Sequence, residues 1–313
     1  MSHSATIVFM GTPQFAVPSL RALYEAGFKV RLVVTQPDRP SGRGRKSTPP
    51  PVKLAALELG CAVDQTPRVR EAAFIERLQA IAPDFLVVVA FGQILTQRLL
   101  DIPARGPVNV HASLLPKYRG PAPMQWAILK GEKETGITTM RMDRGVDSGD
   151  ILLSARTPIL PEETSATLHD RLARLGAELL IETLYGMLRG EIIPRAQDHA
   201  RATHAPMLKK SDGRIDWGQP AEAIDRLVRA MIPWPGTYCF WESQRLKIYK
   251  TSVVSTHHQS RPGTVLPGFA DELRVAAGQG QISIIELQGA SGKRLPVKEF
   301  LHGHPIAPGT LLS

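Results

Sequence analysis

The sequence DFLVVVAFG occupies residues 84–92, and VNVHASLLPKYRG follows at residues 108–120. The run from Phe85 to Ala90 is apolar and rich in valine, which is typical of a strand buried on both faces of a parallel sheet. Residues 108–110 predict a second such strand. Asn109 and His111 are therefore expected at its carboxyl end, the edge where open α/β sheets form their binding crevices.

Three polar side chains near this edge favour acyl transfer. The amide of Asn109 can donate to a developing oxyanion, an interaction worth about 3–4 kcal/mol in enzymes. A histidine such as His111 can shuttle a proton, and Asp147, in DRGVDSGD at residues 143–150, can orient the imidazole. An Asn-x-His pair after a strand is also typical of a turn with a surface histidine. The surrounding pattern has to separate the two interpretations.

Length and composition are those of a globular protein of two domains. The chain has 313 residues, of which 43% are hydrophobic and 21% charged. No apolar run is long enough to cross a membrane, and residues 1–10 lack the basic front and cleavage site of a signal peptide. We expect a soluble, cytoplasmic monomer without membrane attachment.

Cysteine and histidine usage gives no support for a disulfide framework or a metal site. The two cysteines, Cys61 and Cys239, have no partner at metal-ligand spacing. His302 and His304 are separated by one glycine and followed by a proline, which is typical of a loop. We expect no metal.

The charge balance favours a polyanionic partner. The chain has 38 Lys and Arg against 29 Asp and Glu, for a net charge of +9. Nucleic acid is the commonest polyanion that a basic protein meets. Charge that serves solubility alone is the other interpretation.

The N-terminal half alternates strands with helices, as in a doubly wound, mostly parallel α/β sheet. It lacks Gly-x-Gly-x-x-Gly, so a dinucleotide fingerprint is absent. We expect strands at residues 5–10, 29–36 and 60–64, and helices at 14–26, 52–60, 71–81, 121–130 and 164–189. Residues 136–142 and 150–155 predict an antiparallel pair whose connection returns Asp147 towards His111.

Residues 37–51 combine glycines, prolines and serines with four cations and one acid, Asp38. This composition predicts a long mobile loop rather than a helix or strand. The loop is either a solvated surface segment or one that follows a phosphate backbone by charge.

The C-terminal third begins after residue 206. Residues 190–206 lose periodicity and indicate a linker, so the first domain is expected to span residues 1–189. Short strands separated by glycines, such as residues 246–250 and 282–287, predict a small β-barrel over residues 207–313. This segment has 13 Lys and Arg against 9 Asp and Glu and is mildly basic.

Asn109-x-His111-x-Ser-Leu-Leu-Pro116, followed by Arg119-Gly120 and by Asp-Ser-Gly-Asp at residues 147–150, resembles the signature of the formyltetrahydrofolate-dependent formyltransferases. The resemblance implies that Asn109, His111 and Asp147, called here the polar trio, are the catalytic residues. It also implies a Rossmann-like catalytic domain followed by an OB-like barrel. The wall of the site would consist of Ser113, Leu114, Leu115 and Pro116.

The same resemblance assigns two binding regions beside the trio. The first holds the folate head group and would consist of Phe91, Gly92, Ile94, Leu95, Met142, Asp143, Gly145 and Val146. The second is the loop on the acceptor side of the cleft, with Gly11, Thr12, Pro13 and Phe15.

The basic loop resembles that of the family branch that acts on methionyl-tRNA, in which QPDRPxGRG enters the acceptor end of the tRNA. The match implies tRNA contacts by Arg43 above all, with Arg39, Arg45 and Lys46 in support. IDW at residues 215–217 and PWP at residues 233–235 are similar to the entry motifs of that branch's tRNA-binding barrel.

The resemblance implies transfer of the formyl group of 10-formyltetrahydrofolate, the co-substrate, to the α-amino group of methionine on initiator tRNA, without a metal. Two alternatives remain open. The acceptor is instead a sugar nucleotide or glycinamide ribonucleotide, or the chain is a nucleic-acid-binding protein without catalytic activity.

Overall fold

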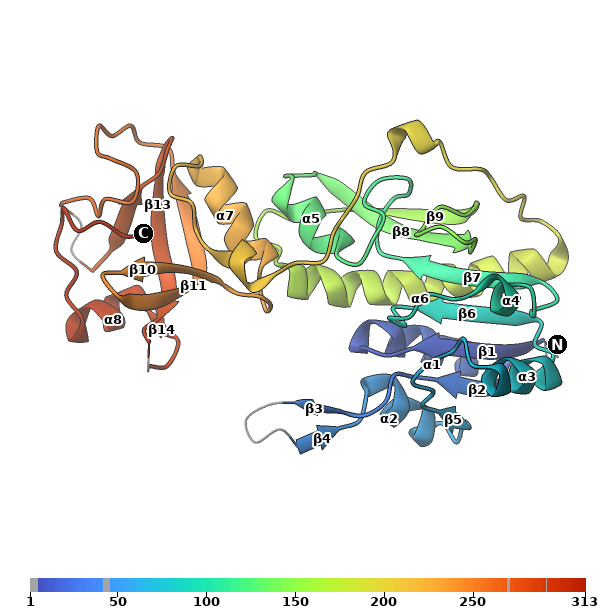
Figure 1. The fold of residues 1–313 in the computed structure, drawn as a ribbon. Helices are drawn as coiled ribbons and strands as arrows, with labels where there is room; N and C mark the ends of the chain where they lie inside the picture. The colour runs from blue at the N-terminus through green and yellow to red at the C-terminus, as the bar shows by residue number, and fades with distance from the viewer. Residues whose placement is uncertain (1–4, 42–45, 269–270, 291) are drawn as a thin grey trace. The chain divides into compact units, whose positions relative to one another are not determined.

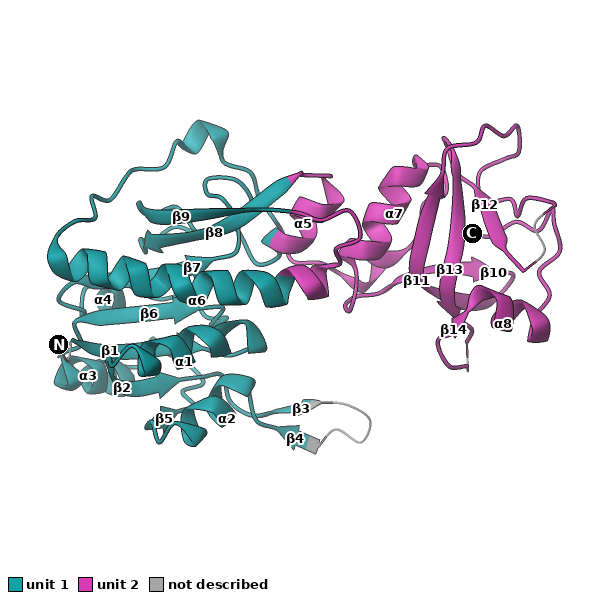
Figure 2. Cartoon of the chain, turned by 180° about the vertical axis from the view of Figure 1, so that it is seen from behind, with its two compact units in different colours: residues 1–123, 134–158, 169–205 teal, residues 124–133, 159–168, 206–313 magenta. Residues whose placement is uncertain are grey.

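The computed structural model describes residues 5–41, 46–268, 271–290 and 292–313 (Figure 1). The chain forms two compact units, coloured separately in Figure 2. Unit 1 comprises residues 1–123, 134–158 and 169–205, and unit 2 comprises residues 124–133, 159–168 and 206–313. Each unit therefore combines segments that are separated in the sequence.

Unit 1 is built on a seven-stranded, mostly parallel sheet, which confirms the predicted α/β class. The strands are β1 Thr6–Gly11, β2 Lys29–Val34, β5 Val63–Asp64, β6 Phe85–Val89, β7 Gly106–His111, β8 Glu134–Arg141 and β9 Ile151–Pro158. Their order is β5-β2-β1-β6-β7-β8-β9, and the pairs from β5 to β7 are parallel. The pairs β7–β8 and β8–β9 are antiparallel. The carboxyl ends of β1, β6 and β7 consequently meet at one edge.

The core of unit 1 lies on both faces of this sheet. Every residue of β6 is buried, as expected for a strand that helices cover on both sides. The helices that unit 1 contains whole are α1 Val17–Glu25, α2 Pro51–Glu58, α3 Ala72–Ile81 and α4 Gln97–Leu100, with the 3₁₀ turns η1 Gln14–Ala16 and η2 His199–Arg201. The long helix α6, Ser165–Arg189, supplies the fully buried Leu172, Leu180 and Leu184. This spacing of four and eight residues is the apolar stripe expected from the sequence.

The prediction of a loop without helix or strand over residues 37–51 was wrong for two short stretches inside that segment. Residues 39–41 and 46–48 form strands β3 and β4, Arg39–Ser41 and Lys46–Thr48, which pair as an antiparallel hairpin. Its register pairs Pro40 with Ser47. A two-stranded ladder of polar residues needs only local backbone pairing, so its sequence carries no apolar alternation.

Unit 2 contains an antiparallel half-barrel, the architecture expected for the C-terminal third. Its strands are β10 Thr237–Trp241, β11 Gln244–Val254, β12 Leu273–Ala276, β13 Gln281–Gln288 and β14 Leu295–Pro296. They run in the order β10-β11-β13-β12, with β14 on β13. Single bridges from β12 to Val265, from Thr264 to Leu311 and from Leu312 to β10 continue the pairing between the two outer strands.

Helices cover this half-barrel, and its interior is apolar. Unit 2 also contains nearly all of α5 Pro123–Leu129, together with the turn η3 Lys210–Gly213, α7 Ala221–Ala230 and α8 Val297–Gly303. Trp217, Ile224 of α7, Cys239 of β10 and Phe300 of α8 belong to one buried cluster. The segment that resembles a family entry motif, residues 215–217, therefore contributes to the core of the unit.

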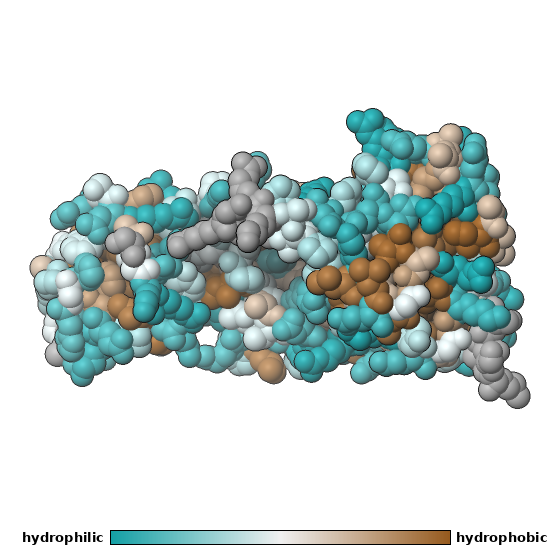
Figure 3. All heavy atoms as spheres, turned by 90° about the horizontal axis from the view of Figure 1, so that it is seen from below, coloured by the Kyte–Doolittle hydropathy of each residue, from teal (hydrophilic) through white to brown (hydrophobic). Residues whose placement is uncertain are grey.

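Seen from below, apolar residues gather at the right of Figure 3, while the surface at the left is mostly hydrophilic. On α2, Leu54 and Leu57 are 48% and 57% exposed.

Across the part of the chain that the structure describes, no helix is both long enough and apolar enough to span a membrane.

Candidate active site

Asn109 and His111 lie in the last residues of β7. Their exposed fractions are only 8% and 6%. β6 pairs with β7 as far as Asn109, and β8 pairs with both residues. β7 runs parallel to β6, so both strands end at the same edge of the sheet. This is the position that the sequence predicted for the two side chains.

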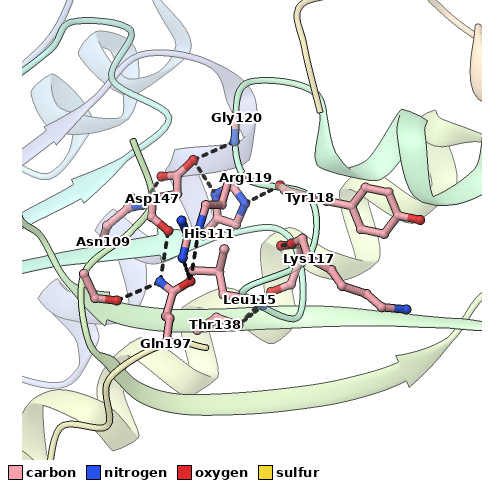
Figure 4. A network of polar contacts seen from close by, with 12 residues as sticks. Asn109, His111, Leu115, Lys117, Tyr118, Arg119, Gly120, Thr138, Asp147 and Gln197 are labelled. Atoms are coloured by element: carbon pink, nitrogen blue, oxygen red, sulfur yellow. Dashed lines mark hydrogen bonds and ion pairs between the residues drawn. The ribbon is translucent and has the colours of Figure 1, made fainter. Parts of the chain in front are cut away.

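The structure brings the predicted polar trio together (Figure 4). Asn109 Nδ2 lies 3.4 Å from Asp147 Oδ1, and His111 Nδ1 lies 3.6 Å from Asp147 Oδ2. The backbone N–H of Gly120 donates to Asp147 Oδ2 at 2.8 Å. The connection between β8 and β9 thus returns Asp147 to the end of β7, and the carboxylate lies between the amide and the imidazole.

The partners of the His111 ring define its hydrogen positions. Nε2 lies 2.9 Å from the carbonyl oxygen of Tyr118. A carbonyl only accepts, so Nε2 must carry the hydrogen. Nδ1 faces the carboxylate of Asp147 at 3.6 Å, which is beyond hydrogen-bonding distance. The two ring nitrogens therefore face different partners, the Tyr118 carbonyl and the Asp147 carboxylate.

Backbone conformations of high energy cluster around these groups. Asp147 has a φ of 51° and Tyr118 a φ of 60°, a left-handed conformation that costs an ordinary residue about 1–2 kcal/mol. Gly120 has a φ of 117°, and a Cβ there would lie 2.7 Å from the carbonyl oxygen of Ala205. Only glycine fits at position 120.

The expected wall of the site is a rigid, hydrogen-bonded turn. Ser113 is fully buried, and its hydroxyl donates to the carbonyl of Lys117 at 2.6 Å. The hydroxyl of Thr138 in β8 donates to the carbonyl of Ser113 at 2.7 Å and accepts from the N–H of Leu115 at 3.1 Å. Leu115 is buried, whereas Leu114 and Pro116 are half-buried.

Gln197 belongs to the site, although no pattern in the sequence marks it. It lies in the segment expected to be a linker and is only 5% exposed. Its Nε2 donates to the carbonyls of Asp147 and Gly149 at 2.9 and 2.7 Å, and its Oε1 accepts from Arg119. A glutamine in an aperiodic segment has no sequence signal that would identify such a role.

The two segments expected to hold a folate head group lie side by side. Arg144 Nε donates to Gln97 Oε1 at 3.1 Å, and Met142 packs on the cluster that contains Phe91 and Leu95. Ile94 is 83% exposed and Val146 62% exposed. These two apolar side chains are exposed, whereas Phe91, Leu95 and Met142 of the same loops pack together.

The remaining residues of this group shape the loops. Phe91 and Leu95 are buried. The backbone turns sharply here, because Ala90 has a φ of 47° and Gly92 a φ of 84°. The carboxylate of Asp143 accepts from the N–H of Gly145 at 3.0 Å and from the hydroxyl of Ser148. Asp143 and Gly145 therefore order the connection that carries Val146 and Asp147.

The acceptor-side loop lies against the Phe91 loop. The hydroxyl of Thr12 donates to the carbonyl of Phe91 at 3.0 Å. Gly11 is buried at the end of β1, Pro13 is exposed, and the ring of Phe15 packs edge-on against His169 at 5.3 Å. The structure therefore joins the predicted acceptor and folate loops at one edge of the sheet.

The structure describes only part of the predicted group of basic residues. Arg39 is exposed on β3, and its Nη2 donates to Gln36 Oε1 at 3.1 Å. Lys46 opens β4, while Arg43 and Arg45 lie outside the described residues. No group of three or more His, Cys, Asp or Glu side chains that could hold a metal ion is found within the described ranges.

Comparison with known proteins identifies the family. Residues 5–184 match the formyl transferase family, and residues 207–305 match the formyl transferase C-terminal domain. This chain belongs to the formyl transferase family. The part of this formyl transferase that matches the family's N-terminal domain therefore contains the polar trio and both loops that were predicted to bind substrates.

The formyl transferase is similar over nearly its whole length to curated relatives. It is 52% identical to the methionyl-tRNA formyltransferase of Citrifermentans bemidjiense and 50% identical to that of Trichlorobacter lovleyi. Each match covers 98% of this chain and 96% of the relative.

Among solved structures, the sugar 3N-formyl transferase WlaRD, crystallised in the presence of dTDP and 5-N-formyl-THF, superposes with a TM-score of 0.68 at 19% identity. The match covers 93% of this formyl transferase and 100% of WlaRD. At that identity, the likeness concerns the fold.

Proposed function

We propose that this formyl transferase passes the formyl group of 10-formyltetrahydrofolate to the α-amino group of methionyl-tRNA. The proposal depends chiefly on the 50–52% identity to methionyl-tRNA formyltransferases over 98% of the chain. Convergence of Asn109, His111 and Asp147 on one point supports the acyl-transfer chemistry. Initiator tRNA is the expected acceptor, and the cytoplasm is the expected compartment.

The polar trio has the groups that this reaction requires. The methionyl nitrogen attacks the formyl carbon, forming a new C–N bond and a tetrahedral oxyanion. The free N–H of the Asn109 amide and the protonated His111 ring stabilise the negative oxygen. Asp147, directly or through a water, takes the proton that the amine loses. That proton passes to N10 of the folate as the C–N10 bond breaks, so Asp147 is again deprotonated at the end of the reaction.

The loops around Ile94 and Val146 fit the head group of the folate substrate. Their exposed apolar side chains can cover the faces of a pterin ring. Backbone groups of residues 91–95 and 142–146 supply donors and acceptors for its edge. The predicted wall at residues 113–116 follows β7 directly, so a head group held by these loops would place the formyl carbon near the polar trio.

We place tRNA contacts in two regions. The first is the β3–β4 hairpin with Arg39, Arg43, Arg45 and Lys46, which would enter the acceptor end where the first base pair is weak. The second is unit 2, through residues 207–313. The catalytic function would then belong to residues 1–189, followed by a connection at 190–206.

Within unit 2, the outer face of β10 and β11 is the best candidate for RNA contact. The register pairs Tyr238 with Lys247 and Phe240 with Arg245, and the ring of Tyr238 meets that of Phe240 edge-on. The guanidinium of Arg245 lies 3.6 Å from the centre of the Tyr238 ring, and that of Arg214 lies 5.6 Å from the Phe240 ring. Basic residues interleaved with aromatic rings are typical of surfaces that bind RNA. We call this set the β10–β11 face.

The cations of the β10–β11 face differ from the ion-paired cations of the same segment. Among the described residues, carboxylates pair with Arg229 (Asp225), Lys250 (Glu162), Arg274 (Glu272), Arg294 (Glu286) and Lys298 (Asp271). For Arg214, Arg245 and Lys247, no carboxylate of the described residues lies within 4.0 Å. Arg214 also lines a recess of about 530 Å³ together with Arg261. Cations without partners remain available for phosphates.

The test is a formyl-transfer assay with a choice of acceptors. Purified protein is incubated with 10-formyltetrahydrofolate and methionyl-tRNA of the initiator or elongator type, a 3-amino sugar nucleotide, or glycinamide ribonucleotide. We expect formyl-methionine on initiator tRNA and little product elsewhere. Formylation of the sugar nucleotide or of glycinamide ribonucleotide in place of tRNA would assign the other acceptor. Folate binding without transfer to any acceptor would exclude the catalytic proposal.

A further inference from the structure

The amide of Gln197 is the most completely engaged side chain near Asp147. Its Oε1 accepts from Arg119 Nε at 3.1 Å and from Nη2 at 2.7 Å. Its Nε2 donates to the carbonyls of Asp147 and Gly149 at 2.9 and 2.7 Å. Arginine only donates and carbonyls only accept, so the orientation of the amide is unambiguous. All four hydrogen-bonding positions of Gln197 are used.

The two carbonyls that Gln197 holds belong to the segment that carries the Asp147 carboxylate. Asp147 has a φ of 51°, a conformation that an ordinary residue keeps only when its surroundings impose it. On the other side, the N–H of Gly120 binds Asp147 Oδ2 at 2.8 Å. Gln197 thus fixes the backbone of this segment, while Gly120 fixes the carboxylate.

Arg119 fixes Gln197 in turn. Its side chain is only 8% exposed, and Nη2 also reaches His199 Nδ1 at 3.0 Å. Its backbone N–H donates to Thr203 at 2.9 Å, and its carbonyl accepts from Ala205 at 2.7 Å. Figure 4 shows Arg119, Gln197 and Asp147 as one connected network beside His111. The network therefore runs from a buried cation to the polar trio.

We propose that Gln197 is a positioning residue for the transfer reaction. Held by Arg119, it binds the backbone of Asp147 and Gly149 and so keeps the carboxylate between Asn109 and His111. The inference rests on the proposed function, because the position of Asp147 matters for turnover only if this carboxylate acts in the transfer. Gln197 itself touches none of the reacting atoms.

Two substitutions separate positioning from simple packing. Gln197→Ala removes both donors and takes the amide oxygen away from Arg119, whose side chain then keeps, among the described residues, only its contact with His199. Gln197→Glu keeps the shape and offers Arg119 a charged partner, but its oxygens cannot donate to the two carbonyls. If Gln197 positions Asp147 by donation, both variants lower kcat about 10- to 100-fold, as small displacements of catalytic groups do. KM for 10-formyltetrahydrofolate changes less than kcat, by up to about threefold, since Gln197 binds residues 147 and 149 rather than the residues expected to contact the folate.

Thr183→Ala provides the matched control for a loss of stability. Thr183 is fully buried on α6 and bonds to Thr139 of β8 at 2.7 Å. It has no hydrogen bond to a residue of the polar trio. We expect this variant to lower the midpoint of thermal unfolding and to keep wild-type kcat. The inference is overturned if Gln197→Glu retains wild-type kcat, or if Gln197→Ala lowers kcat no more than Thr183→Ala does.

Hydrogen exchange without substrate gives a measurement independent of the acceptor. We expect faster amide exchange across residues 144–150 in both Gln197 variants and unchanged exchange in Thr183→Ala. Unchanged exchange in the Gln197 variants contradicts the positioning role even if the enzyme formylates methionyl-tRNA. Failure of the wild-type protein to formylate methionyl-tRNA counts against the proposed function, and the exchange result still decides whether Gln197 holds the Asp147 segment.

Discussion

Asn109 offers one N–H to Asp147 at 3.4 Å, and no other described residue accepts its second N–H. The side chain is 8% exposed at the end of a buried strand, so its amide is fixed by the backbone of β7. A fixed donor of this kind stabilises negative charge without reorganising during the reaction.

We therefore expect Asn109→Ala to lower kcat by about 10²- to 10³-fold, the usual cost of one oxyanion donor. Folate affinity should change little, because we expect other loops to hold the head group. Single-turnover kinetics and equilibrium binding of 10-formyltetrahydrofolate measure the two effects. A variant with wild-type turnover would remove Asn109 from the mechanism.

Cys239 gives a second prediction at the residue scale. Burial on the inner face of β10 raises its pKa to about 12. The reactive thiolate is therefore scarce at pH 8, at about one part in 10⁴. Partial burial raises the pKa of Cys61 as well, but that side chain is half-buried and reachable.

We expect iodoacetamide at pH 8 to modify Cys61 in the native protein and Cys239 only after unfolding, as measured by mass spectrometry of peptides. Cys61→Ser should then remain unlabelled until denaturant is added. Labelling of Cys239 in native Cys61→Ser would show that the barrel opens without unfolding.

At the scale of elements, the base of the β3–β4 hairpin is held by a polar cluster. Gln65 donates to Asp38 Oδ1 at 2.6 Å, and Lys53 donates to both carboxylate oxygens at 2.9 Å. These hydrogen bonds lower the pKa of Asp38 below its ordinary value of 3.8. The bond from Gln65 contributes most, and the bond from Lys53 comes next. The cluster connects the segment before β3 with α2 and with the residue after β5.

The sign of the pH dependence follows from this lowered pKa. A carboxyl group whose pKa is lower in the folded state stabilises that state fully above its unfolded pKa. The contribution is lost as the pH falls through the folded value, below 3.8. We expect protection of the β3 and β4 amides against hydrogen exchange to fall in that range, relative to the protection measured near neutral pH.

Asp38→Asn should remove most of this change, since the amide does not titrate. Glu58→Gln is the matched control, because Glu58 pairs with Arg21 on an exposed face of α2 and the substitution alters charge equally. A pH response that persists in Asp38→Asn would assign it to another group.

At the scale of the whole molecule, the chain has a net charge of +9. Some of its cations have carboxylate partners and others have none among the described residues. In unit 2, carboxylates pair with Arg274 and Lys298, whereas Arg214 and Arg245 meet aromatic rings and no carboxylate of the described residues. A surface that binds RNA gains affinity through such unpaired cations, and the gain depends on salt.

We expect the double variant Arg214→Ala with Arg245→Ala to weaken binding of methionyl-tRNA and to make it less dependent on salt. The slope of log K against log salt should fall by about one for each phosphate that the protein no longer neutralises. Filter binding between low and physiological salt measures both quantities, and kcat at saturating tRNA should be retained.

The control is Arg274→Ala with Lys298→Ala, which removes the same charge from ion pairs on the same barrel. This double variant should bind tRNA as the wild type does. Equal weakening in both double variants would attribute tRNA binding to the net charge of unit 2 rather than to the β10–β11 face.

Much of unit 1 could be predicted because its signals are local. The apolar run of β6, the three- and four-residue spacing of α6 and the strand end at Asn109 and His111 each lie within one segment. The hairpin β3–β4 and the short helix α4 escaped prediction, since neither presents a sustained apolar period. Short polar elements depend on backbone pairing that sequence spacing does not reveal.

The sequence by itself determined the α/β class, the order of the main strands and helices, and the three polar residues whose spacing marks this family. Only the tertiary structure decided that Gln197 meets Asp147, 50 residues away, and that Arg119 meets Gln197, 78 residues away. It also decided which cations of the barrel have carboxylate partners. The physical reason is that periodicity records which face of an element is buried, whereas hydrogen bonds and ion pairs between distant segments exist only once the chain has folded.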